Sequence, residues 1–216
     1  MTYNEIGYHG TKKANQDGIL GNGIHQSVGE RHWLGDGVYF FTEAFHAYKW
    51  RYDACRDNMC KQGKAFELDC LIIQARINTL DERVFDLTKY QHKLVFDEIL
   101  NTIEKIKPRS CWEKKAVAEG VAFNYMFNVL ADFRRNYDAV KALFQWRGKM
   151  LNCYNLKLSS DKPQMQICVK NELMPSGEQT IQSIGIYDHN DEIDNLEKLR
   201  VSWSYSARNR QHRNYR

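Results

Sequence analysis

The chain has 216 residues, of which 43% are apolar and 27% are charged, and its formal net charge is +4. These values are ordinary for a compact globular protein, and we predict one domain over residues 1–216. No apolar run is long enough to span a bilayer. The N-terminus, Met-Thr-Tyr-Asn-Glu, is polar with an early acidic residue, unlike a signal peptide. We therefore expect a cytoplasmic protein without membrane contact.

The cysteines predict neither a metal site nor a disulfide framework. Six cysteines are scattered along the chain, and none forms a C-x-x-C pair. No cysteine–histidine group has the spacing of a zinc site. Free thiols are the expectation for a chain without a secretory signal, and we predict no bound metal.

The first part of the chain, residues 1 to about 87, is predicted to mix strands and helices. The segment from Thr11 to Leu20 is predicted as a short helix, ended by glycines that supply positive φ for a turn. Thr42 is a suitable N-cap for a second helix, from Glu43 to about Asp57. Aromatic, β-branched and apolar runs predict three strands, which are Tyr3–Tyr8, Gly37–Phe41 and Phe66–Ile77.

Residues from about 88 to 147 are predicted to form a helical insertion. After Thr88, apolar residues recur at spacings of three to four, as on one face of a helix, until Pro108 ends the run. A second run begins at Trp112. A third apolar stripe closes the insertion, and it consists of Tyr137, Val140, Leu143 and Phe144.

The C-terminal part returns to strands, predicted from Gln164 to Lys170 and from Ile181 to Tyr187. Strand-rich parts on both sides of a helical insertion predict an α+β fold. The last residues, about 200–216, form a basic aromatic tail with five arginines, three aromatic residues and no acid. Such a tail suits contact with phosphates and bases. A solvated terminal tail is the alternative.

Two short motifs near the N-terminus carry chemistry. The first is Tyr8-His9-Gly10-Thr11, in which the histidine can donate one hydrogen bond and accept another, as a ribose hydroxyl requires. Its glycine lets a ligand approach the backbone closely. The second is Gly35-Asp36-Gly37-Val38-Tyr39-Phe40, where aromatic residues after a glycine turn offer a flat surface for a planar ring. Each motif alone also fits a plain strand end or a hairpin turn with core aromatics.

Taken together, the order, spacing and flanks of these motifs resemble the catalytic domain of the ADP-ribosyltransferases. The similar branch is the diphtheria-toxin-like, H-Y-E branch, which includes the poly(ADP-ribose) polymerases. The resemblance covers about fifty contiguous residues, from Tyr8 through Gly18-Ile19-Leu20 and the glycine-rich motif to Ala44–Trp50. It implies a split β-sheet core interrupted by the helical insertion, with NAD as co-substrate.

The resemblance also implies roles for individual residues. His9 would hold the ribose next to the nicotinamide, and Gly10 would bind the carboxamide through its backbone. Thr11, directly after them, is a further cofactor-binding candidate. Tyr39 would stack on the nicotinamide ring.

A second aromatic residue should close the other face of the nicotinamide, and two residues compete for this role. Trp50 lies eleven residues after Tyr39, the expected offset, whereas Tyr48, which we prefer, fits if the helix begins earlier. Arg31 falls in the loop that would cover the cofactor and is a candidate pyrophosphate ligand. A surface arginine is the equal alternative.

The third position of the H-Y-E pattern falls on Gln166. The segment from Pro163 to Val169 resembles the family's late strand, which carries a glutamate there. A glutamate supplies charge and basicity, whereas a glutamine offers only hydrogen bonds. Glu172 lies past the expected strand end. This departure favours a single transfer over polymer synthesis.

The resemblance therefore implies an NAD-dependent mono-ADP-ribosyltransferase, a glycosyltransferase that cleaves the nicotinamide–ribose bond. The acceptor is a macromolecule, either protein or nucleic acid, and a toxic transferase would require a neutralising partner. Two alternatives stay open. In one, water captures the ribose carbon and the protein is an NAD glycohydrolase. In the other, the pocket binds NAD or ADP-ribose without catalysis.

Overall fold

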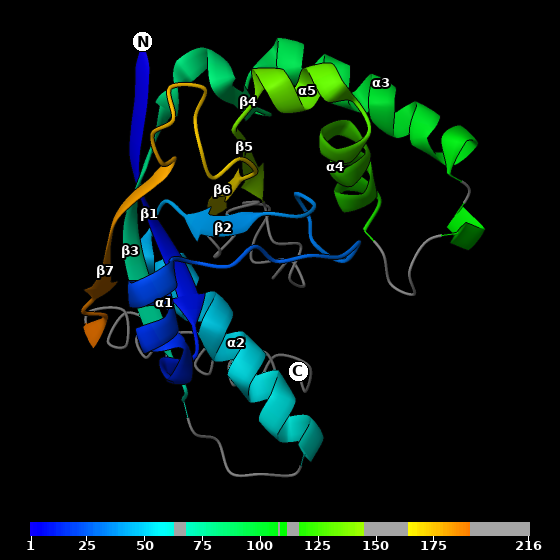
Figure 1. The fold of residues 1–216 in the computed structure, drawn as a ribbon. Coiled ribbons are helices and arrows are strands. Elements are labelled where there is room, and N and C mark those ends of the chain that lie inside the picture. Colours follow the sequence, from blue (N-terminus) through cyan, green and yellow to red (C-terminus); the bar gives the residue numbers. More distant parts are fainter. Residues whose placement is uncertain (63–67, 108, 112–116, 145–163, 191–216) are drawn as a thin grey trace, which may run out of the picture.

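A mixed β-sheet with helices on its faces forms the core of the protein (Figure 1). The computed structural model describes residues 1–62, 68–107, 109–111, 117–144 and 164–190. The strands are β1 (Thr2–Thr11), β2 (Val38–Phe41), β3 (Leu71–Leu80), β4 (Val84–Asp86), β5 (Ala139–Phe144), β6 (Gln164–Val169) and β7 (Ile181–Tyr187). The helices are α1 (Gln16–Asn22), α2 (Ala44–Gln62), α3 (Tyr90–Ile106), α4 (Ala118–Asn128) and α5 (Ala131–Asn136). The predicted α+β class is confirmed.

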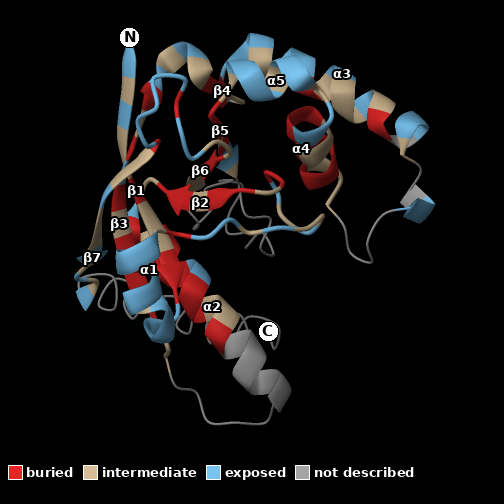
Figure 2. Ribbon diagram, viewed as in Figure 1, coloured by how far each residue is buried: buried red, intermediate tan, exposed pale blue. Residues whose placement is uncertain are grey.

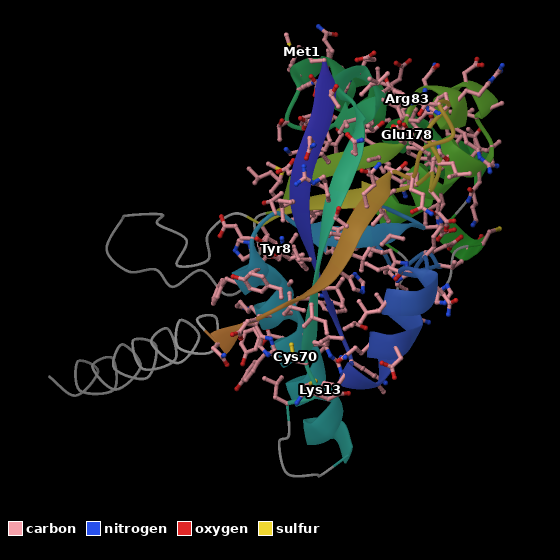
Figure 3. The ribbon with its side chains drawn as sticks, turned by 60° about the vertical axis from the view of Figure 1, so that its left-hand side comes forward. Met1, Tyr8, Lys13, Cys70, Arg83 and Glu178 are labelled. Atoms are coloured by element: carbon pink, nitrogen blue, oxygen red, sulfur yellow. The ribbon has the colours of Figure 1, made fainter. Side chains whose placement is uncertain are left out.

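The sheet has the order β4-β5-β6-β2-β1-β3-β7. Among the described strands, β4 and β5 form the one parallel pair, and every other neighbouring pair is antiparallel. β1 pairs with β3 from Thr2 to Thr11, but it pairs with β2 at one position alone, Tyr8 opposite Phe41. Tyr8 lies partway along β1, between Met1 and Lys13 (Figure 3). Because β1 and β2 diverge from this pair, the sheet consists of two parts joined at one point.

Alternation along the strands divides the core between the two faces of the sheet. Val38 and Phe40 pack with Ile19 of α1 on one face. Phe41 packs with α2 on the other face, and Cys168, opposite Tyr39, packs there with α4. Figure 2 shows the buried residues concentrated in the strands and on parts of α2 and α4. Helices α2, α3 and α4 therefore cover the face that carries Tyr39.

The structure corrects several predicted boundaries in the first part of the chain. The first helix begins at Gln16 rather than Thr11, because Thr11 still pairs with Leu71 in the sheet. Helix α2 begins close to the predicted residue but continues to Gln62. Strand β3 runs from Leu71 to Leu80, later than predicted, and β4 was not predicted at all.

The prediction that the helical insertion continues to about residue 147 is wrong at its C-terminal end. Helices are confirmed for α3 and α4, and α5, the last helix among the described residues, ends at Asn136. The third apolar stripe is largely strand β5, which lies between β4 and β6 with Ala139, Val140 and Ala142 buried. Residues 145–147 and the basic aromatic tail at 200–216 lie outside the described residues. Strands β6 and β7 are confirmed where they were predicted.

A buried carboxylate joins the ends of several strands. Asp138, directly before β5, is fully buried. Arg83 donates to both of its oxygens, from Nε and Nη2, each at 2.7 Å. Thr79 donates from Oγ1 at 2.6 Å and Asn171 from Nδ2 at 3.2 Å. Burial alone would raise the pKa of Asp138, but the hydrogen bonds, with that from Arg83 the largest, hold the pKa below its ordinary value.

None of the described helices is both long and apolar enough to cross a membrane.

Candidate functional site

His9 connects the two parts of the sheet where β1 and β2 diverge. Its Nδ1 lies 2.8 Å from the Tyr39 carbonyl oxygen. Because a carbonyl can only accept, Nδ1 carries the proton, and in the neutral ring Nε2 keeps its lone pair. Burial lowers the pKa of His9 below 6.5, and the hydrogen bond to Tyr39 only partly opposes this. His9 is thus a neutral side chain with a hydrogen-bond acceptor at Nε2.

The lowered pKa of His9 predicts a stability that decreases in acid. Below its unfolded pKa, near 6.5, the unfolded chain binds a proton more readily than the folded chain does, so stability falls as pH falls through this range. The free energy of unfolding should fall between pH 7.5 and about pH 5.5 in the wild type. We expect it to fall less over the same range in His9→Gln. Urea denaturation at both pH values measures the difference. An unchanged difference in the variant contradicts the prediction.

Gly10 lies where helix α2 packs directly on β1. A Cβ at this position would be 2.6 Å from the Ala47 carbonyl oxygen and 3.4 Å from Cβ of Arg51. The neighbouring atoms include backbone, which cannot rotate away. The side of the Gly10 α-carbon that faces α2 is therefore closed, and a ligand can reach this glycine only through its backbone edge.

Gly10→Ala is expected to destabilise the protein by about 1–3 kcal/mol, because α2 must move to admit the methyl group. Gly18→Ala in α1 is the matched control. A Cβ at Gly18 meets nothing within 4 Å, so we expect no loss of stability there. Thermal and urea unfolding of both variants test this, and equal stabilities of the two would contradict the close packing.

The Tyr39 side chain is fixed by the loop that precedes β2. Its hydroxyl donates to the Gly35 carbonyl at 2.6 Å and accepts from the Leu34 amide at 3.0 Å. Gly35 has φ of +71°, a conformation that favours glycine, and a Cβ there would meet Asn124 Oδ1 at 2.3 Å. Burial raises the pKa of Tyr39, so the phenol stays neutral. The ring is thus held rigidly by its own hydroxyl.

His32 is a residue of this loop whose place in the site was not predicted. Its ring centroid lies 5.8 Å from that of Tyr39. Its Nδ1 is buried and has no hydrogen-bond partner in the structure. A buried polar atom without a partner is costly unless a ligand supplies one. In the sequence, His32 was visible only as part of the loop expected to cover the cofactor.

The two candidates for the second stacking aromatic differ in burial. Tyr48 is 2% exposed and packs in a cluster with Phe41 and Ile72, with its ring 5.4 Å from that of His189. Trp50 is 53% exposed. Tyr39 packs instead at the edge of the cluster built around α4. The structure does not bring either candidate into the cluster that contains Tyr39.

Gln166 lies on the same sheet face as Tyr39. It pairs with Phe41 of β2, and two residues later Cys168 pairs with Tyr39. Residues two apart in a strand share a face, so the half-buried Gln166 side chain and the Tyr39 ring lie on one side of the sheet.

The other predicted site residues lie near the ends of elements. Thr11 ends β1, is buried, and accepts a hydrogen bond from Asn15 Nδ2 at 2.9 Å. Arg31 is exposed on the loop before β2. In the described part of the chain, no three His, Cys, Asp or Glu side chains form a metal-binding group.

Comparison with known proteins identifies one archaeal relative. The chain is 34% identical to a protein of Methanocaldococcus jannaschii named "Uncharacterized protein MJ0359", with 76% of this chain and 81% of that protein covered. That name assigns no activity. No family model matches the chain, and no solved structure matches it. At this identity and coverage, the chain belongs to the same protein family as MJ0359.

Proposed function

We propose that this protein is an NAD-dependent mono-ADP-ribosyltransferase with the split-sheet fold of the H-Y-E branch. The observation that carries the proposal is the 2.8 Å hydrogen bond between His9 and the Tyr39 carbonyl. It joins the two motifs that resemble this branch at the point where β1 and β2 diverge. The His9 ring and the Tyr39 backbone, thirty residues apart in the sequence, therefore meet in space, whereas the His9 ring packs at Phe40, on the sheet face opposite to the Tyr39 ring.

The proposed reaction breaks the bond between the nicotinamide nitrogen and C1′ of the ribose. The electron pair of this bond goes to the nicotinamide, and an oxocarbenium-like ribose remains. Tyr39 stacks on the nicotinamide ring, and Nε2 of His9 accepts a hydrogen bond from a ribose hydroxyl. The acceptor then forms a bond to C1′ and loses its proton. Rate acceleration arises from positioning and electrostatics, since none of these residues becomes covalently bound.

Gln166 supports a single transfer rather than chain elongation. It shares a sheet face with Tyr39. Its amide can hold a ribose hydroxyl, but it offers neither negative charge nor basicity to activate another ribose as acceptor. An acceptor that is already nucleophilic, in a protein or a nucleic acid, tolerates this difference.

Incubation with NAD labelled in the adenylate part tests the proposal. The protein is incubated with a whole-cell extract, and the products are treated in parallel with protease and nuclease. We expect release of nicotinamide and label on a macromolecule that one of the two treatments removes. Label found only in free ADP-ribose shows an NAD glycohydrolase instead. No nicotinamide release with any acceptor leaves a binding module and overturns the proposal.

A further inference from the structure

A small polar cavity lies beside the C-terminal end of β6, next to α4 and α5. Its volume is about 150 Å³. Two cations, Arg134 and Lys170, line it together with one carboxylate, Asp36. Amide side chains, among them Asn124 and Asn128, make up most of the remaining wall. Nothing in the proposed transfer reaction uses this cavity.

Lys170 brings a positive charge into the protein without a carboxylate partner. Its ammonium group donates to the carbonyl oxygens of Leu34 and Asp36. Nζ also lies 5.9 Å and 5.1 Å from the ring centroids of Phe123 and Phe127. No ion pair among the described residues includes Lys170. Burial of an unpaired cation is costly, and it lowers the pKa of Lys170.

The one carboxylate of the cavity already has donors of its own. Oδ1 of Asp36 accepts one hydrogen bond from the Gly29 amide at 2.8 Å and another from Nδ2 of Asn124 at 3.1 Å. Arg134 lies exposed on α5, and no ion pair among the described residues includes it. Two cations against one such carboxylate leave the cavity with a net positive charge.

We propose that this cavity binds a phosphate group. A volume of about 150 Å³ is well above what one water molecule needs, so the cavity has room for the few heavy atoms of a phosphate group. The guanidinium fork of Arg134 matches two phosphate oxygens, and the Asn128 amide adds a donor. The phosphate adds negative charge next to Lys170 and Arg134, beyond that of Asp36. The site does not depend on the proposed transferase activity, although it shares the Leu34–Asp36 loop with the anchor of Tyr39.

Calorimetric titration of the full chain with inorganic phosphate, at constant ionic strength, tests this site. Arg134→Ala is expected to weaken phosphate binding by about tenfold or more. Arg135→Ala is the matched control, because Arg135 is the next residue of α5 and pairs with Asp132 instead. We expect that variant to bind phosphate within about twofold of the wild type. Asn128→Asp, which places a carboxylate at the cavity, should weaken phosphate binding at least as much as Arg134→Ala does.

The same titration distinguishes the sources of the phosphate. Adenosine monophosphate that binds more tightly than inorganic phosphate, again through Arg134, assigns the cavity to a nucleotide. Equal binding assigns it to free phosphate. The proposal is overturned if the wild type does not bind either ligand, or if Arg134→Ala and Arg135→Ala weaken binding equally, which indicates only general surface charge. Loss of nicotinamide release alone, with phosphate binding intact, contradicts the transferase proposal and leaves this one standing.

Discussion

His9→Ala should reduce nicotinamide release from NAD by about 100-fold or more. The substitution removes the Nε2 acceptor and the only side-chain hydrogen bond that the structure shows between β1 and the Tyr39 backbone. In the proposed reaction the ribose then loses a partner, and Tyr39 loses a constraint on its position. Measurement of nicotinamide release at saturating NAD, with binding followed separately, shows how the loss divides between binding and reaction.

His25→Ala is the control for the loss of a histidine, because His25 is exposed on the segment between α1 and β2. We expect its nicotinamide release to equal that of the wild type. Tyr39→Ala should reproduce the loss seen with His9→Ala, since it removes the stacking surface. If His9→Ala and Tyr39→Ala both release nicotinamide at the full rate while remaining folded, the assignment of the pocket is wrong.

Asp138→Ala is expected to lower the free energy of unfolding by about 3–5 kcal/mol. Asp138 is fully buried, and its removal leaves Arg83 and the Thr79 hydroxyl without their shared partner. Because the pKa of Asp138 is held below 3.8, its contribution is present above that pH and is lost as the pH falls through the lowered value. Urea denaturation at neutral pH measures the loss.

Asp132→Ala provides a matched comparison for Asp138→Ala. Asp132 makes an ion pair with Arg135 at the same 2.7 Å distance, but both side chains are largely exposed. Exposed pairs contribute little to stability. We therefore expect Asp132→Ala to unfold at the wild-type urea concentration. A comparable loss in the two variants would show that burial is not what makes the Asp138 network strong.

Local patterns in the sequence were enough to place β2 and β6, which carry Tyr39 and Gln166, whereas β1 continues to Thr11, beyond its predicted end at Tyr8. Strand β2 is a short aromatic and β-branched run directly after Gly35 and Gly37, and β6 alternates around Ile167 and Val169. Strand β5 was predicted as helix because alanine, valine, leucine and phenylalanine within six residues fit either period. The segment forms a strand because it pairs between β4 and β6 in the sheet. That pairing depends on residues far away in the chain, which a local pattern does not contain.

The finer features of the site depend on contacts that sequence patterns do not contain. Aromatic residues occur on several sides of α2, so the sequence of this helix does not indicate which of them faces the core. It therefore did not show that Tyr48 is buried and Trp50 exposed. The bond from His9 to the Tyr39 carbonyl depends on how two distant strands cross. The position of Lys170 against the Leu34–Asp36 loop was invisible for the same reason.

The single residue pair between β1 and β2 also has a mechanical consequence. A sheet interface with many ladder bonds resists rotation, whereas one pair, Tyr8 with Phe41, acts as a pivot. The hydrogen bond from His9, the residue after Tyr8, to the Tyr39 carbonyl then restricts rotation about this pair. Amide hydrogen exchange should therefore be faster along the edges that face each other across this joint than in the β1–β3 ladder. Ligand bound between the two edges would lock the pivot and slow that exchange.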